Sequence, residues 1–280
     1  MYTKWLVPSR RSRIPAVLIA FILLLATVIP AAAVTFGVPD GEGHPHVGLM
    51  VFDVGGRPSH RCTGTLLSST VMLTAGHCTF GTSGGRVWFD ADVAAGRPGN
   101  GYPFAGGTGI EFSEIYTHPD YNDGAFYLFD IGIAILSEPV VLDTYGTLAD
   151  IGTLDGLKTQ RGLQEQSFTV VGYGLQSVKP TLQADLVRYR GTVNLIDVSG
   201  TAGIPAGTSV LLTNNPGKHA SGGTCFGDSG GPNFIDDTNV VGGVTSFALN
   251  GNCAGTGGVY RVDKADDLDW LYSEFGDYLP

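Results

Sequence analysis

Short stretches of apolar and β-branched residues recur along the chain, and turn-forming Gly, Pro, Asn and Asp residues separate them. The stretches are Val47–Phe52, Gly64–Ser68, Val71–Thr74, Val87–Phe89, Ile131–Leu136, Phe168–Val171, Val210–Thr213 and Val240–Val244. Such short runs between turn signals are typical of strands in an antiparallel sandwich or barrel. The pattern therefore predicts an all-β fold, with residues 96–109 as a long surface loop or a lid.

The C-terminal segment has a different, helical period. Four apolar side chains fall on one helical face: Leu268, Leu271, Tyr272 and Phe275. Asp266 and Asp267 occupy the expected first turn, where the helix dipole favours acids. Gly276 follows as a plausible stop. We therefore expect one helix here, packed against the β-structure through its apolar face.

Residues 1–33 have the composition of a secretory signal peptide. They carry four positive charges, at Lys4, Arg10, Arg11 and Arg13. An apolar run, Ile14–Ile29, and three alanines that end at Ala33 follow. This order predicts a signal that is cleaved after Ala33 and a mature domain of residues 34–280. An uncleaved membrane anchor is the alternative, because about 20 apolar residues can span a bilayer.

The charge balance narrows the choice of partners. The chain carries 16 Lys and Arg against 26 Asp and Glu, which gives a formal net charge of −10. The signal segment holds four of the bases and no acid, so the mature chain has a net charge near −14. Nucleic acid and anionic lipid would be repelled. We therefore expect a secreted, extracellular protein with no nucleic-acid partner and no stable membrane contact after signal removal.

The four cysteines fit an exported protein. They are Cys62, Cys78, Cys225 and Cys253. An even number in an oxidising compartment predicts two disulfides, and spacing alone leaves the three possible pairings open. The cysteines lack C-x-x-C spacing, which disfavours a zinc site.

One glycine-rich stretch, GGTCFGDSGGPNF at residues 222–234, presents a candidate nucleophile in Ser229. Residues 227–231 fit the G-x-S-x-G motif of α/β-hydrolases, but in that fold the histidine follows the serine. All six histidines precede Ser229: His44, His46, His60, His77, His118 and His219. A general base for Ser229 must therefore come from upstream.

Among these histidines, His77 is the strongest candidate. It follows an apolar strand in LTAGHC and adjoins Cys78, so a disulfide there would hold the backbone beside the imidazole. His44 and His46 lie near the mature N-terminus, where we expect a solvated loop. His118 precedes a proline and is also expected in a loop.

Asp130 stands inside the apolar run YLFDIGIAIL. Burying a carboxylate without partners is costly, so this side chain must be paired, hydrogen-bonded or at a strand end. A buried aspartate that orients a histidine would fit, and a structural hydrogen-bonding role fits equally well.

Taken together, the three motifs stand in the order histidine, aspartate, serine. His77 lies in LTAGHC, Asp130 in DIGIAIL and Ser229 in GDSGGP, at intervals of 53 and 99 residues. This is the chymotrypsin order and differs from the subtilisin and α/β-hydrolase orders. From about Val47 to the C-terminal helix, the chain resembles the chymotrypsin/trypsin-like serine peptidases, and we expect a secreted, bacterial-type member.

The resemblance implies two six-stranded antiparallel β-barrels and a C-terminal helix, with the active site in the cleft between the barrels. It implies a monomeric endopeptidase that hydrolyses protein or peptide substrates through an acyl-enzyme, without a cofactor or a metal. Ser229 would attack the carbonyl, His77 would move the proton, and Asp130 would hold the imidazole. The backbone N–H groups of Gly227 and Ser229 would form the oxyanion hole.

The resemblance also implies disulfides and an activation step. The disulfides would be Cys62–Cys78 and Cys225–Cys253. Asp228 would pair with the amine that activation exposes, although the usual Ile-Val-Gly-Gly start is absent. Signal cleavage would expose Val34, 43 residues before His77, and could itself supply that amine. A pocket ordered by other contacts, or a later cleavage, is the alternative.

Five residues align with the specificity pocket of the family: Gly223, Ser246, Phe247, Ala248 and Gly258. The two glycines stand where an acid would meet a basic substrate side chain, so we do not expect specificity for Arg or Lys. The methyl group of Ala248 would narrow the mouth. With nothing charged in the pocket, we expect neutral apolar substrate side chains. A catalytically silent binding protein on the same fold and an ester hydrolase are the alternative functions.

Overall fold

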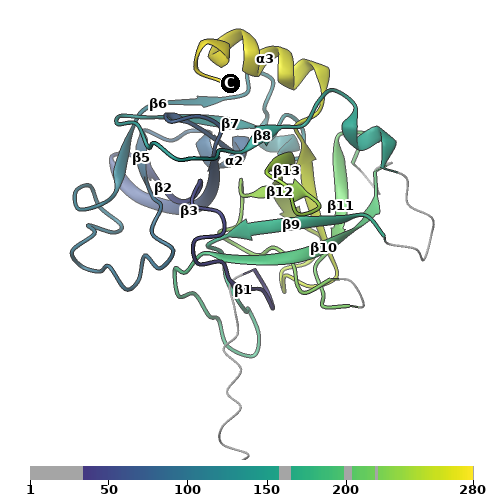
Figure 1. Cartoon of the computed structure of the whole chain (residues 1–280), viewed down its shortest axis with the longest axis horizontal. Coiled ribbons are helices and arrows are strands. Elements are labelled where there is room, and N and C mark those ends of the chain that lie inside the picture. Colours follow the sequence, from purple (N-terminus) through teal and green to yellow (C-terminus); the bar gives the residue numbers. More distant parts are fainter. Residues whose placement is uncertain (1–33, 158–164, 199–203, 218–219, 280) are drawn as a thin grey trace, which may run out of the picture. The chain divides into compact units, whose positions relative to one another are not determined.

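A computed structural model describes residues 34–157, 165–198, 204–217 and 220–279, and its strands close into two barrels (Figure 1). The expected signal peptide, residues 1–33, and His219 lie outside the described residues. The expected fold class is confirmed.

The first barrel has six antiparallel strands. They are β2 (Val47–Val54), β3 (Arg57–Leu66), β4 (Val71–Thr74), β5 (Gly84–Trp88), β6 (Ile110–Thr117) and β7 (Gly132–Leu136). The strands run in the order β2-β3-β4-β7-β6-β5, and β5 pairs with β2 to close the ring. On β2, Met50 and Phe52 enter one core while Leu49 and Val51 pack in another with Trp88. Because both faces are covered, β2 reads as a continuous apolar run rather than an alternating one.

The second barrel follows in sequence and closes in the same way. Its strands are β9 (Ser167–Gly172), β10 (Tyr189–Asp197), β11 (Ser209–Thr213), β12 (Pro232–Ile235), β13 (Val240–Ala248) and β14 (Thr256–Arg261). The order is β10-β11-β14-β13-β12-β9, and β9 pairs with β10 to complete the ring. Two short strands extend this sheet: β1 (Val38–Pro39) pairs with β10, and β8 (Thr147–Leu148) pairs in parallel with β13.

The C-terminal helix α3 (Ala265–Phe275) forms where the sequence predicts it and ends beside Gly276. It follows the second barrel, yet the ring of Phe275 packs on Tyr116 of β6 in the first barrel. Its buried arc includes Asp267 and leaves Tyr272 51% exposed, which corrects the expected apolar face. At about 100° per residue, Asp267 and Tyr272 flank the arc of the buried apolar side chains almost equally. The contacts distinguish them, because Asp267 accepts a hydrogen bond from Tyr260 of the second barrel.

The other helical turns are short. They are α2 (Gly76–Thr79), η1 (Asp123–Ala125), η2 (Thr153–Gly156) and η3 (Gly276–Tyr278). In the part of the chain that the structure describes, no helix is both long enough and apolar enough to cross a membrane.

The loop at residues 96–109 is fastened by Asn100. Its carbonyl accepts a hydrogen bond from Trp88 Nε1 at 2.8 Å, and its side-chain amide donates to the Val93 carbonyl at 2.7 Å. None of these loop residues lines the cavity described below, which favours the surface-loop alternative over a lid.

Candidate active site

His77 and Asp130 meet because their strands are neighbours. His77 lies on α2, immediately after β4, and Asp130 lies immediately before β7, which pairs with β4. Gly76 lets α2 approach this segment, since a Cβ there would lie only 3.1 Å from the backbone of Ile131. His77 Nδ1 lies 2.9 Å from Oδ2 and 3.1 Å from Oδ1 of Asp130. A carboxylate at Nδ1 favours the tautomer with hydrogen there, which leaves Nε2 free to accept a proton.

The Asp130 carboxylate is wholly buried and fully partnered. The backbone N–H of His77 donates to Oδ1 at 2.8 Å. The hydroxyl of Ser246 on β13 donates to Oδ2 at 2.6 Å. Sequence reasoning placed Ser246 only in a pocket wall and missed this contact. Three donors therefore offset the cost of burying the charge and fix the direction of the carboxylate.

Ser229 lies on the turn that leads into β12, and this turn is docked on the first barrel. The carbonyl of Ser229 accepts a hydrogen bond from the Thr63 N–H of β3 at 2.8 Å. Gly230, at φ 77°, sits so close that a Cβ would lie 2.0 Å from Thr74 Oγ1. Only glycine fits there, and its presence brings the serine turn against β3 and β4.

His77 and Ser229 line one cavity of about 400 Å³. Among the described residues, no hydrogen bond joins His77 Nε2 to Ser229 Oγ. Such bonds are often loose until substrate is bound. The backbone N–H groups of Gly227 and Ser229 also have no protein acceptor within the described ranges. Gly227 has φ 98°, a conformation that glycine adopts without strain.

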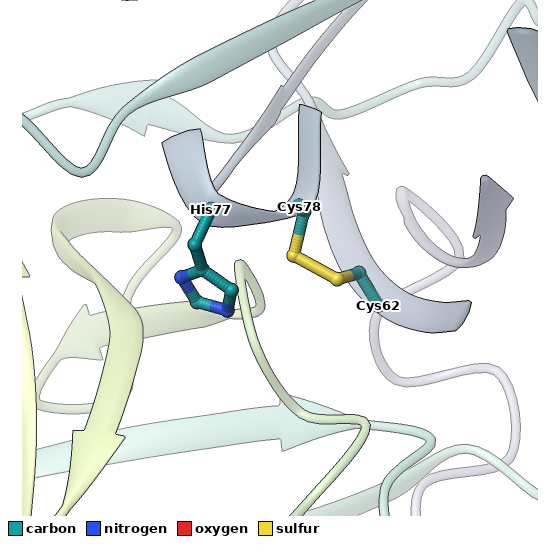
Figure 2. A group of neighbouring side chains, drawn as sticks. All are labelled: Cys62, His77 and Cys78. Atoms are coloured by element: carbon teal, nitrogen blue, oxygen red, sulfur yellow. A yellow bond between two sulfur atoms is a disulfide. The ribbon is translucent and has the colours of Figure 1, made fainter. Parts of the chain in front are cut away.

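Two disulfides flank the site, and they join Cys62 to Cys78 and Cys225 to Cys253. Figure 2 shows His77 and Cys78 on the same helical turn, with the disulfide beside the imidazole. The sulfurs of Cys62 and Cys78 come close enough to His77 for a metal site. They are bonded to each other, however, so they offer no thiolates to a metal.

Aromatic side chains make up much of the cavity wall. The lining residues are His77, Asp123, Phe126, Thr224, Cys225, Phe226, Ser229, Thr245, Ser246, Phe247, Ala248 and Cys253. Asp123 is the acid in this set, and it comes from the exposed turn η1 rather than from the expected pocket floor.

The two glycines expected at the pocket floor do not line the cavity. A Cβ on Gly258 would lie 2.1 Å from the ring of Phe247, so that ring already fills the space beside it. A Cβ on Gly223 would lie 2.3 Å from the Cα of Asn214. Asn214 is buried and exchanges hydrogen bonds with the backbone of Thr224. Sequence reasoning did not identify Asn214, because its position depends on the pairing of distant segments.

Asp228, next to the serine, is buried with backbone donors as its hydrogen-bond partners. The N–H groups of Gly174 and Cys225 donate to its two oxygens at 2.8 and 2.9 Å. Burial raises the pKa of Asp228 to about 7, although these hydrogen bonds act in the opposite direction. A carboxyl in this setting would gain from a nearby cation.

The first described residues lie beside the serine segment. Gly223 N–H donates to the Thr35 carbonyl at 3.1 Å, and Thr35 Oγ1 donates back to the Gly223 carbonyl at 3.1 Å. Val34 is completely buried in the core of the second barrel. The pairing therefore draws the start of the expected mature chain to the segment that carries Asp228 and Ser229.

Comparison with known proteins agrees with this arrangement. The family model described as Trypsin matches residues 39–270. The chain belongs to the trypsin family. It is thus a serine peptidase, a hydrolase that acts on protein substrates.

Several relatives share the trypsin-family sequence along most of their length. Brachyurin of Leptuca pugilator is 28% identical over 83% of this chain and 93% of its own. Trypsin alpha of Drosophila melanogaster is 28% identical over 77% of this chain and 78% of its own. These relatives are arthropod proteins, so the comparison does not support the expected bacterial type. A solved structure titled HL collagenase, 20% identical, has the same fold, with a TM-score of 0.67 over 88% of this chain and 99% of that one.

The remaining described histidines of this trypsin-family chain do not line the cavity. His44 and His46 are buried, at 8% and 1% exposed, which corrects the expected solvated loop. His44 Nδ1 lies 2.7 Å from Asp40, and both rings pack on Phe234. The two imidazoles are buried because they pack on Phe234, which belongs to the core.

Proposed function

We propose that this chain is the precursor of a secreted serine endopeptidase, with Ser229 as nucleophile, His77 as general base and Asp130 as the carboxylate that orients it. The observation that carries the proposal is the pair of short contacts from His77 Nδ1 to buried Asp130, with His77 lining the same cavity as Ser229. Family membership supports the reaction class.

In the proposed mechanism, Ser229 Oγ attacks the scissile carbonyl carbon while His77 Nε2 takes its proton. Asp130 stabilises the resulting imidazolium. The N–H groups of Gly227 and Ser229 donate to the negatively charged oxygen of the tetrahedral intermediate, and one such donor contributes about 3–4 kcal/mol. His77 then protonates the leaving amine, and a water molecule releases the acyl group by the same sequence in reverse.

The proposed substrates carry a neutral apolar side chain on the residue whose carbonyl is attacked. Phe126, Phe226, Phe247 and Ala248 present apolar surface in the cavity. The acid Asp123 comes from an exposed turn. A buried counter-charge is what strong selection for Arg or Lys requires, and none of the cavity's lining residues supplies one.

We further propose that residues 1–33 direct export and that their removal activates the enzyme. The two disulfides favour an oxidising, extracellular compartment. Cleavage before Val34 would create an ammonium group, and the buried carboxyl of Asp228 would be its partner. The pairing of Thr35 with Gly223 supports this placement.

The decisive experiment is covalent labelling of the purified secreted protein with a fluorophosphonate probe, beside the Ser229→Ala variant. Labelling of the wild type alone would support an activated serine with a working oxyanion hole. Equal labelling of both proteins would overturn the assignment of Ser229. Absence of labelling in a protein that begins at Val34 would overturn the proposed activation.

Matched peptide and ester substrates then define the reaction. An apolar peptide anilide and the corresponding ester are compared with an Arg anilide. The proposal expects turnover of the apolar peptide and at least about tenfold slower turnover of the Arg anilide, a difference of about 1.4 kcal/mol. Turnover of esters alone would replace the endopeptidase proposal with an ester hydrolase.

A further inference from the structure

The residue before Asp130 has an unusual backbone conformation. Phe129 has φ 52°, in the left-handed region that bulky side chains seldom adopt. The Ile131 N–H donates to the Phe129 carbonyl at 2.8 Å, so the chain turns sharply around Asp130. A strained conformation persists only where surrounding groups hold it, and such residues often adjoin functional sites.

His118 contacts the residues on both sides of Asp130. Its ring stacks on the Phe129 ring, with centroids 4.9 Å apart and planes at 15°. Its backbone N–H donates to the Ile131 carbonyl at 3.0 Å. Trp270 of α3 packs edge-on against the same imidazole, with centroids 4.8 Å apart. The ring of Phe129 is therefore held from one side by a buried, supported histidine.

A buried carboxylate and a phenol complete the cluster. Tyr260 of β14 donates its hydroxyl hydrogen to Asp267 of α3, with oxygens 2.9 Å apart. His118 Nε2, which has no hydrogen-bond partner among the described residues, lies 3.7 Å from Asp267 Oδ1. The side chain of Asp267 is completely buried on a helix face whose other buried residues are apolar.

We propose that Asp267, Tyr260 and His118 are positioning residues that hold Phe129 in its left-handed conformation and so direct the Asp130 carboxylate at His77. The inference rests on the proposed roles of Asp130 and His77. A buried acid costs stability compared with an apolar residue, and core packing of α3 does not require one. The Tyr260 hydroxyl instead fixes the Asp267 carboxylate beside His118 Nε2. His118 in turn stacks on Phe129 and donates to the Ile131 carbonyl, so the C-terminal helix is connected to both neighbours of Asp130.

The test uses substitutions that preserve shape in the mature enzyme. Tyr260→Phe and Asp267→Asn are expected to lower kcat about tenfold with little change in KM, because small misplacements of a catalytic group slow the reaction step. The low-field NMR resonance of the proton between His77 Nδ1 and Asp130 is expected to shift or broaden. Asp269→Asn removes an exposed acid from the same helix and is the matched control.

Rescue separates positioning from general stability. Asparagine adopts the left-handed region far more readily than phenylalanine. Phe129→Asn in the Tyr260→Phe background is therefore expected to restore much of the lost kcat, because the backbone then needs less support. Unfolding temperatures are recorded for each variant, so a folding defect is recognised directly.

Failure of this inference and failure of the proposed function would give different results. A lower unfolding temperature in Tyr260→Phe and Asp267→Asn, with unchanged kcat and an unchanged low-field resonance, would overturn the positioning role. An Asp130→Asn variant with full kcat would instead overturn the proposed role of Asp130 itself. If Asp267→Asn does not fold, Tyr260→Phe and its rescue by Phe129→Asn decide the question alone.

Discussion

Asp130 Oδ2 is shared between two segments of different barrels. It accepts a hydrogen bond from Ser246 on β13 and lies 2.9 Å from His77 Nδ1. Because Asp130 is completely buried, its carboxylate depends on donors from the protein. The direction of the carboxylate, and with it that of the imidazole, therefore depends on a hydroxyl that comes from the other barrel.

Ser246→Ala tests this dependence. The variant is expected to lose about 1–3 kcal/mol of stability, because it leaves a buried charged acceptor short of one donor. It is also expected to have a lower kcat. Urea denaturation and steady-state kinetics measure the two effects, with the exposed Ser273→Ala as control. Equal values for both variants would show that the Ser246 hydroxyl is dispensable.

Gly223 aligns with the family position at which an acid would bind Arg or Lys, so it is the obvious place to introduce one. Gly223→Asp is expected to destabilise the protein and to give no cleavage after Arg or Lys. Its Cβ would lie 2.3 Å from the Cα of Asn214, and backbone atoms cannot move aside as a flexible side chain can. Thermal unfolding and an Arg-anilide assay measure these effects.

Gly251→Asp is the control for that change, because a Cβ at Gly251 has no neighbour within 4 Å. A stable Gly223→Asp enzyme that cleaves Arg anilides would contradict the arrangement described for Asn214.

These residues also indicate how far the sequence could predict the site. His77, Asp130 and Ser229 each lie in a local motif, so the sequence could identify them together as candidates. The contact of Ser246 with Asp130 joins positions far apart in the chain, and Asn214 is placed by the pairing of β11 with β14. No local pattern predicts either arrangement. Motifs predict which groups are present, whereas tertiary pairing decides what each one touches.

At the scale of elements, the sequence pattern located strands with continuous apolar runs and missed mixed ones. β4 was predicted with its observed bounds, Val71–Thr74. β6 alternates charged and apolar residues, and only its partly buried face packs on the core. β12 begins with a proline, and β14 contains two adjacent glycines. Local propensity disfavours these last strands, so neighbouring strands must impose their conformation.

The N-terminal segment is the element through which the proposed activation is tested. An Ala added before Val34 is expected to reduce kcat/KM at least about 100-fold, because separating a buried ion pair costs about 3–5 kcal/mol. Val34 is completely buried, so one extra residue would displace the new amine from the place proposed for it. The mature N-terminus and kcat/KM on an apolar peptide are the measurements.

A double-mutant cycle supplies the control for this extension. Asp228→Asn alone should cause a similar loss, and the extension should add little to it, since both changes remove the same pair. Additive losses would show that the amine and Asp228 act independently, and full activity of the extended enzyme would exclude amine-dependent activation.

At the scale of the whole molecule, the buried ionisable groups make stability depend on pH in opposing directions. Burial raises the pKa of Asp228 and that of Asp267 to about 7. The folded state therefore holds their protons more tightly than the unfolded state, and their contribution to stability increases as pH falls from about 7 towards 4. Pairing with a new amine would lower the pKa of Asp228 and so reverse the pH dependence of its contribution to stability.

His46 acts in the opposite sense. Burial, followed by the neighbouring charges of His44 and Arg188, lowers its pKa from 6.5 to about 4. As pH falls, His46 is protonated in the unfolded state before it is protonated in the folded state. Its contribution to stability is therefore fully present above pH 6.5 and is lost as pH falls towards 4. A difference of this size corresponds to about 3 kcal/mol. Both ring nitrogens lack hydrogen-bond partners among the described residues, so no contact offsets this loss.

His46→Leu isolates this contribution from those of the acids. The variant and the wild type are expected to have similar free energies of unfolding near pH 8. The variant should become more stable than the wild type, by up to about 3 kcal/mol, as pH falls from 6.5 to 4, because only the wild type gains a proton at this position on unfolding. Urea denaturation across that range measures the difference, and the shared contributions of Asp228 and Asp267 cancel. A difference that does not change with pH would mean that His46 is protonated as readily in the fold as in the unfolded chain.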